Sequence, residues 1–182
     1  MIWAIFSRLK NREHRDTDAT ISPDLQMGSG NGWALRAGEV AMEASNTGQY
    51  SLIRFIAPVS AIYDITARFA GVHFGMSSTD VHVLHNATSL FDAEIEGYGG
   101  DPAFHEIQGV SPTATYSGRV ELRANDSVTF ACGYGKNRTH FSDTKGLFAQ
   151  VVLLSEAGTG RRGDATRREQ SVLGTERQIF TW

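Results

Sequence analysis

The stretch "GRVELRANDSVTFACG", residues 118–133, decides how the chain folds. Apolar and polar residues alternate on both sides of a short polar break, and a period of two is the pattern of a half-buried β-strand. The pattern predicts strands at 117–123 and 127–133 that form a hairpin, with Asn125 or Asp126 in the left-handed conformation that its turn requires. The residues expected to face the core are Val120, Leu122, Val128, Phe130 and Cys132.

The same short period recurs from 33 to 155, with breaks at Gly, Asn, Asp and Pro and with almost no helical periodicity. We expect further strands at 39–43, 50–57, 61–70, 79–85, 89–95, 103–108 and 146–154. Strands this short, without intervening helices, predict an all-β protein, an antiparallel jelly-roll-like β-sandwich with flexible N- and C-terminal segments. Its predicted core contains Phe55, Tyr63, Ile65, Phe69, Val81, Val83, Phe91, Val120, Leu122, Val128, Phe130, Leu147 and Val151.

The two ends of the chain differ from this central region in composition. We expect a loose N-terminal segment at 1–32, one sandwich domain at 33–155 and a disordered, Arg-rich polar tail at 156–182. The opening "MIWAIFSRLK" has too short an apolar run for a signal peptide, and no stretch is long enough to span a membrane. Taken literally the chain stays in the cytoplasm; a missing leader is the alternative. The oligomeric state stays open.

Charge and cysteine content exclude several classes of function. The net charge of −3 is concentrated in residues 21–155, which carry eight basic and thirteen acidic residues. Nucleic acid is not an expected partner, because its phosphates require a basic surface. Cys132 is the single cysteine, so the chain can form neither an internal disulfide nor a cysteine-based zinc site. We expect Cys132 to be a buried, inert thiol.

The stretch "STDVHVLHN", residues 78–86, carries two histidines on one predicted strand. Alternation directs His82 and His85 to opposite faces, so we do not expect them to share a metal ion. A metal site would need further ligands such as His73, His105 or Glu94. Three acids, Asp92, Glu94 and Glu96, share one face of the next strand. We interpret them as a solvated face rather than a glycosidase carboxylate pair, and we expect no catalytic residue.

Two loops combine aromatic rings with planar hydrogen-bonding groups, "EGYGGDPAFHE" at 96–106 and "GYGKNRTHFSDTKG" at 133–146. Aromatic faces can pack on the C–H groups of a sugar while Asn, Arg and Asp bond its hydroxyls. The alternative is that these residues only shape turns. The candidate ligand-binding residues are Tyr98, Asp101, His105, Tyr134, Asn137, Arg138, His140 and Asp143.

Asp143 has two possible roles of its own. Its carboxylate could accept two backbone N–H groups of its turn, or it could join loop carbonyls in holding Ca²⁺. We favour the turn, because Arg138 and Lys145 are close in sequence and one carboxylate makes a poor calcium site. No cofactor is therefore expected, with calcium as the alternative.

Five segments keep their order along the chain and together carry a family resemblance: "IRFIAP" (53–58), "YDITARFAG" (63–71), "TDVHVLHN" (79–86), "SLFDAEIEGYG" (89–99) and "SVTFACGYGKNRTHFSDTKGLFAQV" (127–151). On these segments the region 34–154 resembles a jelly-roll-like β-sandwich module of secreted and surface proteins of environmental bacteria, which is similar to carbohydrate-binding modules. Two departures from that module are Asn125, where it usually has Gly, and Lys145, where it usually has Thr.

The resemblance implies an extracellular or cell-surface location and a polysaccharide or glycan as partner. It does not imply a catalytic activity, and a binding module is a stronger expectation than an enzyme. Two alternatives stay open. One is a structural or assembly domain without a small-molecule ligand. The other is a metal-dependent or acid/base hydrolase that acts on glycans. A cluster of Tyr98, Tyr134 and His140 would favour sugar binding. A flat apolar patch would favour assembly, and converging histidines and carboxylates would favour a hydrolase.

Overall fold

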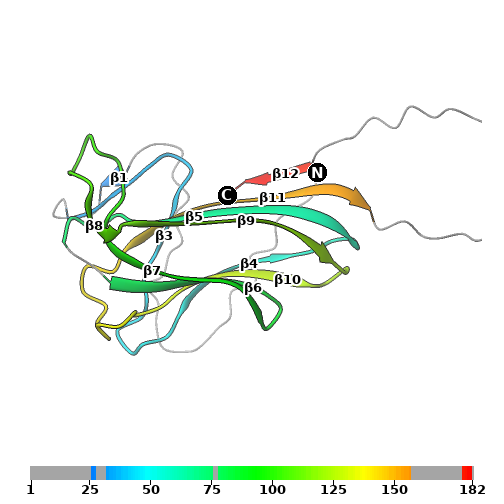
Figure 1. The fold of residues 1–182 in the computed structure, drawn as a ribbon, viewed down its shortest axis with the longest axis horizontal. Coiled ribbons are helices and arrows are strands. Elements are labelled where there is room, and N and C mark those ends of the chain that lie inside the picture. The colour runs from blue at the N-terminus through cyan, green and yellow to red at the C-terminus, as the bar shows by residue number, and fades with distance from the viewer. Residues whose placement is uncertain (1–25, 28–31, 76–77, 157–177, 182) are drawn as a thin grey trace, which may run out of the picture.

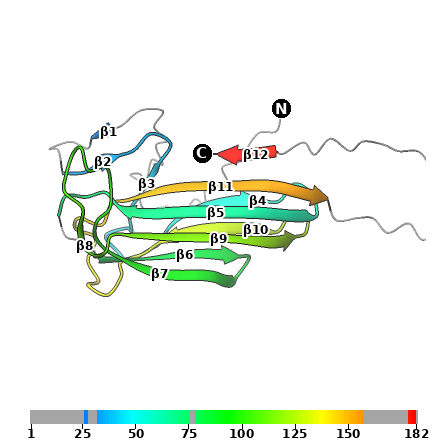
Figure 2. The same ribbon diagram turned by 45° about the horizontal axis from the view of Figure 1, so that its top comes forward.

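Two antiparallel β-sheets packed face to face make up the molecule in the computed structural model, which describes residues 26–27, 32–75, 78–156 and 178–181 (Figures 1 and 2). The first sheet has the order β4-β10-β6-β7-β8, and the second has the order β12-β11-β5-β9. The predicted all-β sandwich is thereby confirmed. The strands of the first sheet are β4 (Ser51–Ile56), β6 (Ser78–His85), β7 (Thr88–Tyr98), β8 (Gln108–Ser111) and β10 (Ser127–Cys132).

The second sheet is joined by a short strand, and a small separate sheet lies at one end of the molecule. Strand β3 (Val40–Met42) pairs with the start of β11, and β1 (Gln26–Met27) pairs with β2 (Ala34–Leu35). The strands of the second sheet are β5 (Ala61–Gly71), β9 (Thr113–Leu122), β11 (Lys145–Glu156) and β12 (Gln178–Thr181). Among the described residues, no helix is long and apolar enough to cross a bilayer.

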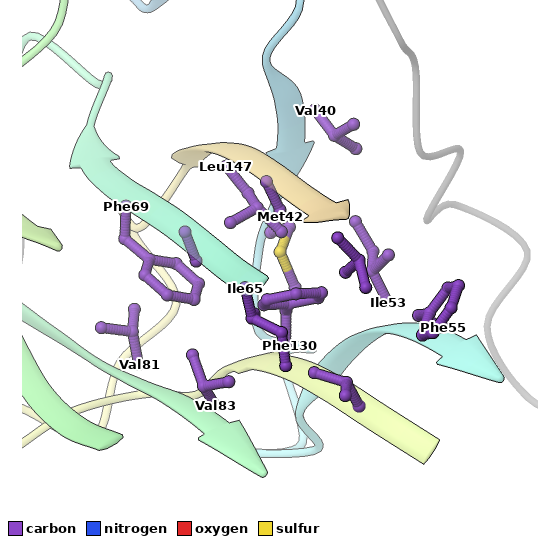
Figure 3. Close-up of a cluster of buried hydrophobic side chains, with 14 of the residues drawn as sticks. Val40, Met42, Ile53, Phe55, Ile65, Phe69, Val81, Val83, Phe130 and Leu147 are labelled. Atoms are coloured by element: carbon purple, nitrogen blue, oxygen red, sulfur yellow. The ribbon is translucent and has the colours of Figure 1, made fainter. Parts of the chain in front are cut away.

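The core lies between the two sheets and follows the alternation read from the sequence (Figure 3). Along β5, Tyr63, Ile65, Ala67 and Phe69 are fully buried, and the residues between them face outward. Val81 and Val83 of β6 are likewise fully buried. All thirteen predicted core residues belong to this cluster, although Phe91 and Val120 are only partly buried.

Two details of the strand prediction are wrong. Strands β9 and β10 do not form a hairpin, because β9 pairs with β5 in one sheet and β10 pairs with β4 and β6 in the other. The segment 123–126 instead crosses between the layers, with Asn125 at the left-handed φ of 73°. The strand expected at 103–108 is a turn region up to Ile107, where the Asp101 side chain accepts the amide of Ala103, and strand β8 begins only at Gln108.

The predicted domain limits fall partly outside the described residues. Most of the segment expected to be loose at 1–32 lies outside the described residues. So do residues 157–177 and 182 of the expected tail. Residues 178–181 form β12, which pairs antiparallel with residues 150–153 of β11.

Candidate functional site

One end of the sandwich, which we call the loop end, carries the segments 43–50, 72–75, 99–107 and 133–144. There β7 and β10 finish while β6 and β11 begin, as the pairings Val81 with Cys132 and Gly71 with Lys145 show. The loops 99–107 (green) and 133–144 (yellow) project from the same side of Figure 1. All eight residues predicted to bind a ligand therefore belong to one end of the molecule.

The segment 72–75 lies between the two loops and contacts both. The Phe74 ring stacks on His105, with ring centroids 5.1 Å apart and an interplanar angle of 22°. On the other side, a β-carbon built on Gly75 would lie 2.8 Å from Oγ of Ser142. The fold thus places the loops 99–107 and 133–144 on either side of one short segment, although 34 residues separate their starts in the sequence.

The predicted ligand residues of the loop 99–107 mainly contact other residues of the same loop. Tyr98 is 1% exposed and its hydroxyl donates to the Asp101 carbonyl at 2.8 Å. Burial raises the pKa of Tyr98, and its ring meets His105 edge-on. The Asp101 carboxylate accepts the Ala103 amide at 2.9 Å. His105 is half-buried, and its buried Nε2 has no hydrogen-bond partner in the described part of the chain.

The loop 133–144 presents its side chains more openly. The Tyr134 ring is half-buried against Gly48, where an added β-carbon would lie 3.1 Å from the ring. Asn137 and Arg138 are exposed, and the Asn137 side chain accepts the amide of Thr139. The rings of His140 and Phe141 are in contact, with centroids 4.3 Å apart.

Phe141 is the most exposed aromatic residue among those that the structure describes, at 73%. The loop also holds two non-glycine residues in the left-handed conformation, Arg138 at φ 52° and Ser142 at φ 65°. Such conformations cost energy and persist where the surroundings enforce them, commonly at binding sites. The strained residues and the exposed aromatic ring therefore belong to the same loop.

Asp143 lies beneath this loop, not on its surface. It is fully buried, and neither carboxylate oxygen accepts a backbone N–H within the described ranges, although the Thr79 hydroxyl lies close enough to lower its pKa. The expectation that it accepts two backbone N–H groups is wrong. Burial raises the pKa of Asp143 to about 6, against the opposing effect of the nearby Lys145 ammonium. Burial likewise lowers the pKa of Lys145, which is also fully buried, to about 8.

The two histidines of β6 have separate partners, as the alternation predicted. His85 lies 3.0 Å from the Asp126 carboxylate at the opposite end of the molecule. His82 faces outward and lies between the carboxylates of Asp80 and Asp92. Within the described residues, no three His, Cys, Asp or Glu side chains are grouped so that they could hold a metal ion.

Asp80 is the residue whose role the sequence did not reveal. Its carboxylate accepts the Tyr50 hydroxyl and the Gly135 amide, and it also contacts His82. Its pKa is lowered, because these hydrogen bonds outweigh the opposing effect of burial. Tyr50, whose pKa the bond to Asp80 raises to about 12, is 49% exposed beside the loop. Only the alternation of β6 hinted that Asp80 and His82 share a face.

Comparison with known proteins identifies no family for this chain. No protein-family model matches it, and no curated protein sequence matches it. A solved family 35 carbohydrate-binding module from Clostridium thermocellum is 13% identical, with coverage of 68% of this chain and 85% of that one and a TM-score of 0.31.

A second solved structure is the Podospora anserina GH26-CBM35 β-(1,4)-mannanase, which is 18% identical with a TM-score of 0.27. The likeness covers 71% of this chain and 25% of the mannanase chain. At these TM-scores the chain is assigned to neither family. Its strands and their register establish the antiparallel sandwich.

Proposed function

We propose that the protein is a non-catalytic carbohydrate-binding module that holds a glycan at the loop 133–144. The observation that carries the proposal is the Phe141 ring, 73% exposed and in contact with His140. An exposed aromatic face next to polar donors suits a sugar, whose C–H groups pack on the ring while its hydroxyls form hydrogen bonds. We also propose, from the family resemblance, an extracellular or cell-surface location with a polysaccharide as partner.

The polar part of the proposed site comes from the same loop. Asn137 and Arg138 are exposed next to the aromatic pair, and the amide and guanidinium are planar groups that can bond neighbouring hydroxyls. The left-handed φ of Arg138 fixes the direction of its backbone before any ligand arrives. A preformed loop loses little conformational entropy on binding, which favours affinity for a weakly held ligand such as a sugar.

Other predicted ligand residues enter the proposal as support. Tyr98 and Asp143 are buried, so in this proposal they support the two loops from below. Tyr134 fixes the first half of the loop against Gly48. Asp101 and His105 lie across the segment 72–75, at the far border of the proposed surface.

A second candidate function, an assembly domain, is favoured by the exposed apolar residues of another segment. Val110 is 90% exposed on the edge strand β8, and Ile107 is 46% exposed just before it. An unguarded edge strand with apolar side chains can pair with another chain. On this second hypothesis, substitutions in 133–144 leave the function unchanged.

A glycan array probed with the whole chain tests the proposal, followed by titration calorimetry with the strongest glycan. We expect Phe141→Ala to weaken binding at least about tenfold, which corresponds to about 1.4 kcal/mol of lost ring contact. Phe104→Ala is the matched control, since Phe104 is an exposed phenylalanine on the other loop. Equal losses in both variants, or binding to no glycan, would contradict the proposed site.

Arg138→Gly separates side-chain recognition from loop shape. Glycine adopts the observed φ of 52° without strain, so the variant removes the guanidinium and preserves the backbone. We expect the same glycan to bind about tenfold more weakly, with a melting temperature no lower than that of wild type. Full affinity in Arg138→Gly would remove Arg138 from the proposed contacts.

A further inference from the structure

The Asp80 carboxylate is a junction of three parts of the molecule on the outer face of the first sheet. It accepts the amide of Gly135, in the loop, at 2.5 Å, and it accepts the hydroxyl of Tyr50, just before β4. The Gly133 amide also donates to the backbone carbonyl of Asp80 at 2.8 Å. The base of the loop 133–144 is therefore held to the sheet largely through one residue of β6.

His82 joins this junction to the neighbouring strand. Its Nε2 lies 2.7 Å from the Asp80 carboxylate and its Nδ1 lies 2.5 Å from the Asp92 carboxylate. Ser89 donates to the second oxygen of Asp92 at 2.6 Å. A carboxylate can only accept, so both contacts are hydrogen bonds only when both ring nitrogens carry protons. The geometry thus selects the imidazolium form of His82.

We infer that protonated His82, bridging Asp80 and Asp92, positions the loop 133–144, so that ligand binding at the loop is coupled to a proton on β6. The positioning role follows from the hydrogen bonds alone. The coupling to a ligand rests on the proposed function. When His82 loses its proton, one of its two carboxylate contacts loses its donor, and the contact becomes repulsive between lone pairs.

Other charged groups around His82 are paired with partners of their own. On β7, Glu94 is bonded to Lys136 of the loop at 2.5 Å. On β4, Arg54 donates to Thr129, and Tyr50 packs with its ring centroid 5.5 Å from that of His82. Residues 129 and 131 of β10, which lie between β4 and β6, are a threonine and an alanine without charge. The other titratable groups at the loop are His140, the buried pair Asp143 and Lys145, and Glu43, which interacts with His140 and Lys145.

The directions of the pKa shifts set the pH range in which His82 bridges Asp80 and Asp92. Burial alone would lower the pKa of His82, but the hydrogen bonds to Asp80 and Asp92 raise it above its ordinary 6.5. The pKa of Asp92 lies below its ordinary 3.8 because of the bonds from Ser89 and His82. The bridge from Asp80 through His82 to Asp92 is therefore complete at pH values above the pKa values of the two carboxyl groups and below the pKa of His82. It weakens as pH rises through the pKa of His82 or falls through those of the carboxyl groups.

Nuclear magnetic resonance of the ¹⁵N-labelled full chain between pH 5 and pH 9 tests the inference without any ligand. We expect both His82 ring nitrogens to be protonated at pH 6, with a titration midpoint above 6.5. The Gly135 amide should titrate with the same midpoint. Asp92→Asn should lower that midpoint by about one pH unit, because it removes one charged partner of the ring.

Three histidine variants make the result specific. In His82→Gln the Gly135 amide should no longer titrate in this range, whereas in His85→Gln, on the same strand but bonded to Asp126, it should titrate as before. His140→Gln should also leave the Gly135 titration in place. Asp143→Asn should leave it in place as well, since Asp143, with its pKa raised to about 6, is the buried carboxyl of the same loop. A neutral His82 ring at pH 6, or a Gly135 titration that follows His140 or Asp143, would overturn the inference. Neither outcome depends on whether a glycan binds.

Discussion

At one end of the sandwich three turns are bound to one another by hydrogen bonds, and at the other end buried polar groups lack such partners. We call the first the turn end; it comprises residues 57–60, 86–87 and 123–126. There the Asp126 carboxylate accepts from Asn86, from His85 and from the Arg123 amide, at 2.9–3.0 Å. At the loop end, the buried Asp143 carboxylate has the Thr79 hydroxyl close enough to lower its pKa but accepts no backbone N–H among the described residues, and the buried Nε2 of His105 has no partner there.

The difference indicates where the molecule is optimised for stability and where it is not. Buried polar groups without partners cost stability, and in native proteins they concentrate where a function requires them. The residues with a left-handed backbone differ between the two ends in the same way. At the turn end the left-handed residues are Asn86 and Asn125, whereas at the loop end they are Arg138 and Ser142. Asparagine tolerates this conformation better than arginine or serine does.

The loop end also depends on close approaches of backbone to backbone, and breaking one of these should have the largest effect. A β-carbon on Gly71 would lie 1.9 Å from the Gly97 carbonyl oxygen, so Gly71→Ala must displace β5 from β7. We expect a loss of about 3 kcal/mol in the free energy of unfolding, measured by urea denaturation. Gly32→Ala is the control, since its β-carbon would meet only the flexible His73 ring at 3.3 Å.

A loss in Gly71→Ala no greater than in Gly32→Ala would mean that the strands can separate freely at the loop end. The comparison between the two ends would then rest on side chains alone.

The same substitution at the two ends should have effects of opposite sign. The bonds from Asn86, Arg123 and His85 lower the pKa of Asp126 to about 2, so the fold favours its ionised form. Burial raises the pKa of Asp143 to about 6, so the fold disfavours its ionised form. At pH 8 we expect Asp126→Asn to lower the melting temperature. Asp143→Asn should raise the stability by about 1 kcal/mol.

If Asp143→Asn destabilises the protein at pH 8, the attraction between Asp143 and Lys145 outweighs the burial of the carboxylate. The loop end would then be as well compensated as the turn end, and the contrast between them would fail.

The pH dependence of the stability gained in Asp143→Asn provides a finer test. The pKa of Asp143 is about 6 in the folded protein and 3.8 ordinarily, so between these two pH values the folded protein binds more protons than the unfolded chain. Its stability therefore falls as pH rises toward 6. The Asn side chain does not titrate. The stability difference between wild type and Asp143→Asn should therefore be constant above pH 7 and should shrink toward pH 4. Urea denaturation at pH 4, 5, 6 and 8 measures this difference. A difference independent of pH would contradict the raised pKa of Asp143.

The sequence predicted the sandwich because alternation directly encodes which side chains are buried, as Val81, Val83 and the residues of β5 show. It did not show that β9 and β10 belong to different sheets, since a turn sequence such as "ANDS" fits both a hairpin and a crossing. The prediction placed Asp143 in a turn. It missed the burial of that residue, because burial beneath a loop depends on the path of the whole chain. The three partners of Asp80 come from distant segments and leave no local pattern.

The smallest expected effect concerns the strained serine of the loop. Ser142 has φ 65°, a conformation that costs a serine energy and that glycine adopts freely, so Ser142→Gly should relieve strain. The greater freedom of glycine in the unfolded chain offsets part of the gain, and we expect a net stabilisation of about 0.5 kcal/mol. Asn125→Gly, at φ 73° in the turn end, should give no gain because asparagine already tolerates the conformation. Parallel thermal and urea denaturation of the two variants measures the difference. A gain at Asn125 equal to that at Ser142 would show that the backbone strain is shared by both ends and does not mark the loop end.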